Sequence, residues 1–131
     1  MGYGFFVAGF VAAGLAWLCN TLFRSWGWYA IVFIAPAVEE GWKTGLAFMG
    51  NVSIPATHMI FGLVEGFWEG VVEGKVRAGI IGIVLHSFLG LLTYGIICWT
   101  GSILGAFFVA YGVHMAWNHL VRIVCQKRQI E

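Results

Sequence analysis

Residues 78–99, AGIIGIVLHSFLGLLTYGIICW, carry no charged side chain and a single histidine, His86. A helix of about 20 apolar residues crosses the roughly 30 Å hydrocarbon core of a bilayer. The whole chain of 131 residues is 60% hydrophobic and only 10% charged. A soluble domain of this length needs more polar residues to cover its surface. The sequence therefore predicts an integral membrane protein.

Four other apolar segments of similar length flank this stretch, and polar or glycine-containing turns separate them. They cover about residues 3–22, 28–49, 56–72 and 103–124. We therefore predict an all-α, polytopic transmembrane bundle of about five helices that forms a single domain over residues 1–131. The first helix lacks charged residues, so we expect it to be a peripheral cover facing lipid.

If the chain crosses the bilayer five times, the basic residues of its loops and C-terminal tail all lie on the same side of the membrane. They are Arg24, Lys75, Arg77, Arg122, Lys127 and Arg128. Because loops rich in lysine and arginine stay in the cytoplasm, we predict an external N-terminus and a cytoplasmic C-terminus. The net charge of +1 gives no indication of a nucleic-acid partner.

Several predicted helices carry ionisable or amide side chains at membrane depth, where such groups are costly and often functional. They are Glu39, Glu40 and Lys43, then Glu65 and Glu69, then His86, and finally His114 with Asn118. Residues four apart share one helical face, and this holds for three pairs: Glu39 with Lys43, Glu65 with Glu69, and His114 with Asn118. Pro36 removes a backbone hydrogen bond one turn before Glu39, which predicts a kink or a wet opening there. We expect the second to fifth helices to direct these groups into one central cavity.

Such a cavity has the components of acid/base catalysis. A carboxylate in a low-dielectric site can act as a general base toward water, and a histidine can share the proton. A histidine and an asparagine on one face can donate hydrogen bonds to an oxyanion. Lys43 would orient a neighbouring carboxylate, and Glu69 is a second supporting acid. Glu39, His86 and His114 are also possible zinc ligands, although no HExxH motif is present.

The order of these residues resembles the motifs of the PrsW-like intramembrane proteases. Glu39-Glu40-Gly41-Trp42-Lys43 matches their EExxK motif, and Phe61-Gly62-Leu63-Val64-Glu65 is similar to their second motif. Arg77 and His86 are similar to the third motif, and residues 114–118, HMAWN, to the closing HxxxN motif. These proteases belong to the superfamily of type II CAAX prenyl endopeptidases and Abi proteins, which also resembles the Aph subunit of gamma-secretase.

The resemblance implies a helical bundle that hydrolyses a peptide bond of a membrane-anchored protein or peptide. It implies that Glu39 and Glu40 activate water with help from Glu65, and that His114 and Asn118 hold the oxyanion. Gly66 departs from the family pattern, in which asparagine often follows the second-motif glutamate. A metalloprotease, a non-catalytic scaffold of the Aph type and a proton-coupled transporter remain alternatives.

Two remaining features suggest packing or interface positions. Gly62, Gly66, Gly70 and Gly74 form a ridge of small residues that allows another helix to approach closely, and self-association is plausible. His58 is expected at the outer interface, where it would have no part in the cavity.

Overall fold

The computed structural model describes residues 2–127, and this part of the chain is helical without strands. The helices are α1 (Gly4–Phe23), α2 (Ala35–Met49), α3 (Ile54–Phe67), α4 (Val76–Thr100) and α5 (Ile103–Lys127). The prediction of five helices is confirmed, and their ends differ from the expected ends by a few residues. Arg128 lies outside the described residues.

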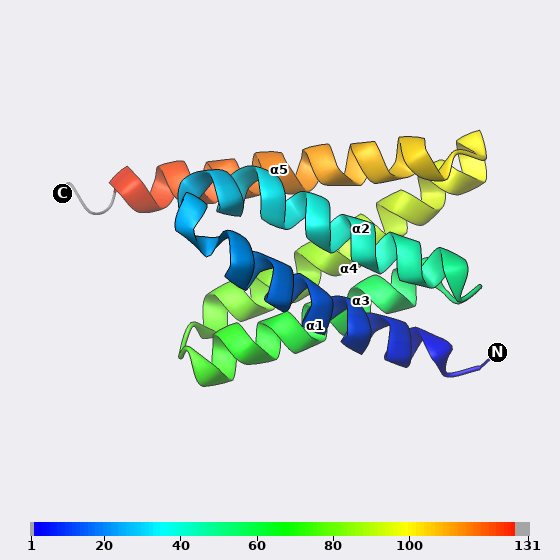
Figure 1. Cartoon of the computed structure of the whole chain (residues 1–131), viewed down its shortest axis with the longest axis horizontal. Helices are drawn as coiled ribbons and strands as arrows, with labels where there is room; N and C mark the ends of the chain where they lie inside the picture. Colours follow the sequence, from blue (N-terminus) through cyan, green and yellow to red (C-terminus); the bar gives the residue numbers. More distant parts are fainter. Residues whose placement is uncertain (1, 128–131) are drawn as a thin grey trace.

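The helices form a bundle in which α3 and α4 make the most extensive contact, while α1 packs on both α2 and α3. Figure 1 shows α5 and α2 along one side of the bundle and α3 along the other, with α1 crossing the front. The beginning of α1 and the end of α5 lie at opposite ends of the bundle (Figure 1).

The close approach of α3 and α4 depends on glycines. A methyl group added to Gly66 would lie 2.6 Å from Ile83 Cγ1 and 2.7 Å from the Gly79 carbonyl oxygen, and one added to Gly62 would lie 2.9 Å from His86 Cβ. The predicted ridge is therefore confirmed at Gly62 and Gly66. At Gly70 an added methyl group would find ordinary contact at 3.7 Å, so this position does not require glycine.

The hydrogen bonding of the helix that contains Pro36 changes from π-helical to α-helical just before the proline. Residues Ala30–Ile34 form a π turn, in which the Ala35 amide donates to the Ala30 carbonyl. Because Pro36 has no amide hydrogen, the Ile31 carbonyl has no donor from its own helix. At this position, where we predict a kink or a wet opening, the structure has a π turn. A second π turn, Trp68–Val72, extends α3.

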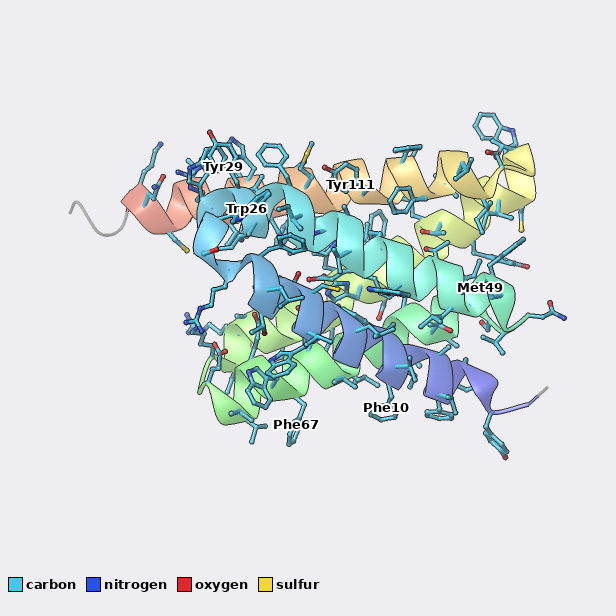
Figure 2. The ribbon with its side chains drawn as sticks, in the orientation of Figure 1. Phe10, Trp26, Tyr29, Met49, Phe67 and Tyr111 are labelled. Atoms are coloured by element: carbon cyan, nitrogen blue, oxygen red, sulfur yellow. The ribbon has the colours of Figure 1, made fainter. Side chains whose placement is uncertain are left out.

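Two helices, Gly4–Trp26 and Val76–Thr100, are long and apolar enough to cross a membrane. Only 17% and 22% of their most apolar windows is buried within the protein. Large apolar side chains from all five helices point outward. Figure 2 shows Phe10 and Phe67 extending from one side of the bundle, and Trp26 and Tyr29 lying near the end where α1 finishes. The interior, in contrast, contains Glu39, Glu40, Lys43 and three of the four histidines.

Candidate functional site

A cluster of buried polar side chains occupies the centre of the bundle. Its members are Glu39, Glu40, Lys43 and Thr44 from α2, His58 and Glu65 from α3, His86 from α4 and His114 from α5. Glu65 is the most accessible of these, with 35% of its side chain exposed. The prediction that four helices direct polar groups to one place is confirmed in its geometry.

Lys43 is the centre of a continuous chain of hydrogen bonds. Its Nζ lies 2.5 Å from Glu40 Oε1 and 2.8 Å from His86 Nδ1. On the far side of this chain, His86 Nε2 lies 2.5 Å from Glu65 Oε2. At the other end, His114 Nδ1 lies 2.9 Å from the same Glu40 oxygen. The chain links α3, α4, α2 and α5 through side chains alone.

These partners assign the tautomers of both histidines. An ammonium group only donates, so His86 Nδ1 accepts from Lys43 and His86 Nε2 carries the proton that it donates to Glu65. A carboxylate only accepts, so His114 Nδ1 donates to Glu40. His114 Nε2 is then left with a free lone pair. It lies 3.8 Å from Glu39 Oε2, which is too far for a direct hydrogen bond.

Glu39 differs from Glu40 in its surroundings. Glu40 is fully buried, and its Oε1 accepts from both Lys43 and His114. Glu39 Oε1 accepts a 3.1 Å hydrogen bond from Asn20 Nδ2 of α1. Its other oxygen, Oε2, is buried and, like Glu40 Oε2, has no hydrogen-bond partner among residues 2–127. Buried carboxylate oxygens are rarely unpartnered, so this atom is a candidate for binding a ligand.

Asn20 corrects the expectation that the first helix is only a peripheral cover. Its amide bonds Glu39, and α1 also forms one wall of a cavity of about 570 Å³ that reaches Glu39 and Glu65. The sequence contained one signal for this role, since Asn20 is a single amide in an otherwise apolar helix. That signal does not show which residue the amide contacts.

His58 also corrects an expectation, because it is fully buried and does not lie at an interface. Its Nε2 lies 3.3 Å from Thr44 Oγ1, and its Nδ1 lies 3.7 Å from Glu40 Oε2. The absence of a side chain at Gly90 makes room for it, since an added methyl group there would lie 2.6 Å from His58 Cβ. His58 therefore belongs to the polar cluster.

Asn118 does not join the cluster, although it lies one turn after His114. Its Nδ2 donates a 2.9 Å hydrogen bond to the Ile31 carbonyl, the same carbonyl that the π turn and Pro36 leave without an intrahelical donor. The expected position beside an oxyanion is therefore wrong for this conformation. Asn118 instead connects α5 to the irregular turn before α2.

Two other predicted residues lie away from the centre. Glu69 lies in the π turn after α3, is half-buried and borders the cavity with Glu65. Arg77 is exposed in the first turn of α4 and contacts none of the cluster. It therefore has no part in this site.

Glu39, His86 and His114 could together hold a metal ion. One ligand atom from each lies within 4.8 Å of the others, and all three residues are buried. A carboxylate and two imidazoles form a common zinc ligand set. However, His86 Nδ1 and Nε2 already bond Lys43 and Glu65, so a metal at either nitrogen would replace one of these contacts.

Comparisons with protein-family models, curated proteins and solved structures found no match to this chain. The arguments for its function therefore depend on the geometry of the site and on the motif resemblance.

Proposed function

We propose that the chain is an integral membrane protein whose five helices all span the bilayer. An apolar exterior around a charged interior suits a protein surrounded by lipid. The loops before α2 and before α4 lie at the same end of the bundle as the end of α5 (Figure 1). This end carries the basic residues Arg24, Lys75 and Arg77, which supports a cytoplasmic C-terminus and an external N-terminus.

We propose that the polar cluster is the active site of an intramembrane endopeptidase similar to the PrsW-like proteases. The observation that carries this proposal is the 3.8 Å separation between Glu39 Oε2, a buried oxygen without a hydrogen-bond partner, and His114 Nε2. Each has a lone pair without a donor among the described residues. A water about 2.8 Å from both would donate one hydrogen bond to each of them.

The surrounding contacts give each residue a separate task in hydrolysis. Asn20 holds Glu39 through its other oxygen, and Glu40 fixes His114 in the tautomer whose Nε2 accepts. Glu39 removes a proton from the water, and the resulting hydroxide attacks the peptide carbonyl carbon. The tetrahedral intermediate then breaks its C–N bond, and the Glu39 carboxyl returns the proton to the departing amine. The substrate is a membrane-anchored protein or peptide.

Lys43 keeps this arrangement in place. It compensates the charge of Glu40 in a part of the bundle without access to water. Through His86 it also connects Glu40 to Glu65, the acid that borders the cavity. The site therefore combines a charged half around Lys43, which positions residues, with a half around Glu39 that contacts water and substrate.

A metalloprotease is the second candidate, because Glu39, His86 and His114 lie close enough to share an ion. In that case a zinc ion would lower the pKa of a bound water, and His86 would lose its contact with either Lys43 or Glu65. Metal analysis of the purified protein and sensitivity to a chelator separate the two candidates.

The function is tested by reconstituting the purified protein in liposomes with single-pass and prenylated peptides and detecting products by mass spectrometry. Glu39→Gln should abolish cleavage, while Lys127→Gln, which changes an exposed charge at the end of α5 outside both the cluster and the cavity, should not. Cleavage that persists in chelator supports the glutamate-dependent reaction, and cleavage lost in chelator supports the metal. If no peptide is cleaved while Glu39→Gln folds as the parent does, the site is a structural network of a scaffold or transporter.

A further inference from the structure

The cavity that reaches Glu39 lies between α1 and α3 with its π turn. On α1 it extends from Ala13 to Arg24, and on the other side from Phe61 to Glu73. Its length along α1 is about 16 Å at 1.5 Å per residue. α1 and α3 diverge toward the end of the bundle where α1 finishes (Figure 1). Trp17 and Phe67 line the cavity and are 61% and 60% exposed, so it opens to the outside of the bundle.

The acids of this region outnumber its buried cations. Glu39, Glu40, Glu65 and Glu69 lie in or beside the cavity, and Lys43 is the buried lysine that compensates them. Lys75 is not available, because it donates a 2.7 Å hydrogen bond to Glu73, which lowers the pKa of the Glu73 carboxyl.

Glu69 itself has no ion pair within residues 2–127, and neither has Arg24 on the opposite wall. The carboxylates of Glu65 and Glu69 both point toward Gly82 of α4, since a methyl group added there would lie 4.0 Å and 3.9 Å from their Oε2 atoms. Two neighbouring carboxylates of like charge favour a cationic ligand.

A second observation connects the cavity to the reacting atoms. Glu39 borders it, and Glu39 Oε2 is a buried carboxylate oxygen without a donor in the described chain. The cavity volume of about 570 Å³ lies within the range of ligand-binding pockets. The apolar walls suit a chain that arrives from the lipid.

We propose that this cavity receives the peptide substrate and that Glu69 selects a lysine or arginine on the cytoplasmic side of the cleaved bond. This inference depends on the endopeptidase function proposed above. Glu69 lies one helical turn, about 5.4 Å, beyond Glu65 toward the cytoplasmic end. An extended peptide advances about 3.3 Å per residue, so about two residues cover this turn, and the basic residue lies at least about two residues from the cleaved bond. Membrane-anchored segments carry basic residues on this side.

The test measures binding separately from cleavage. In a Glu39→Gln background, Phe67 is replaced by p-benzoylphenylalanine, and photo-crosslinking captures a single-pass peptide with lysine three residues beyond the central bond. The matched control places the same residue at Phe108 on α5, which is 63% exposed and outside the cavity. Capture is expected at Phe67 and not at Phe108. Glu69→Gln should weaken capture about fivefold, the effect of an ion pair near 1 kcal/mol.

Charge reversal keeps the proposal falsifiable if single variants bind poorly. The Glu69→Lys variant should prefer a peptide with glutamate at that position over the lysine peptide, and in the active background the change should appear in KM rather than kcat. Capture that follows charge supports the inference even if no peptide is cleaved. Cleavage without any charge preference overturns the inference and leaves the protease function intact. Capture of phospholipid that added peptide does not displace also overturns it.

Discussion

Replacing Lys43 with methionine should destabilise the protein strongly, because it leaves a buried carboxylate without its cation. Lys43 and Glu40 are both fully buried, and their 2.5 Å contact is an ion pair in the centre of the bundle. Methionine has a similar length and apolar character, so packing around the side chain is largely retained. The effect therefore reports the loss of the charge and its two hydrogen bonds.

Removing one partner of a buried ion pair costs about 3–5 kcal/mol. For a chain of 131 residues, 1 kcal/mol corresponds to about 3–5 °C in Tm. We expect Lys43→Met to lower Tm by about 10–20 °C. The double variant Lys43→Met/Glu40→Gln should recover most of this loss, because the glutamine oxygen still accepts from His114 while the uncompensated charge is gone.

The assay is thermal unfolding in detergent, followed by tryptophan fluorescence from the seven tryptophans. Lys75→Met is the matched control. It removes a lysine from an exposed pair with Glu73 and should leave Tm unchanged. A loss below about 1 kcal/mol in Lys43→Met would refute the reasoning, since no buried charge would then depend on Lys43. A double variant as unstable as the single one would refute it equally.

Three other substitutions test individual contacts. Asn118→Leu should lower the free energy of unfolding by about 1–2 kcal/mol, because it leaves the Ile31 carbonyl without a donor. The kcat of the folded fraction should stay unchanged. A 100-fold fall in kcat would instead assign Asn118 to the oxyanion. Gly66→Ala should destabilise by about 1–3 kcal/mol because the methyl group meets backbone on α4, whereas Gly70→Ala should be neutral in the same denaturation experiment. Asn20→Leu should reduce kcat more than it raises KM, because the Glu39 carboxylate loses the hydrogen bond that holds it in position. An unchanged kcat would contradict this role of Asn20.

The helices and the members of the polar cluster were largely predictable. Runs of apolar residues interrupted near Arg24, Gly50, Glu73 and Gly101 defined the five helices, because the hydrophobic period and turn residues are local properties. Charged and histidine residues in those runs identified Glu39, Glu40, Lys43, His86 and His114 as members of one buried site, and all five are buried.

Contacts between helices were the part that local patterns could not supply. His58 was expected at an interface because it lies near a helix end, yet Gly90 on α4 gives it space inside the bundle. Asn118 was expected beside His114 because they share a helical face, yet the unbonded Ile31 carbonyl on another helix attracts its amide. Both outcomes depend on residues distant in the sequence.

The helical class, the five segments and the acids and histidines placed within apolar runs can all be read from local patterns. Composition and hydrophobic period are enough for these features, because each helix satisfies its own backbone hydrogen bonds. The pairing of Lys43 with Glu40 rather than Glu39, and the contact of Asn20 with Glu39, depend on how the helices pack. The reason is that α2 offers both carboxylates about 100° apart, and the packing of α1, α4 and α5 around it selects the partners of each.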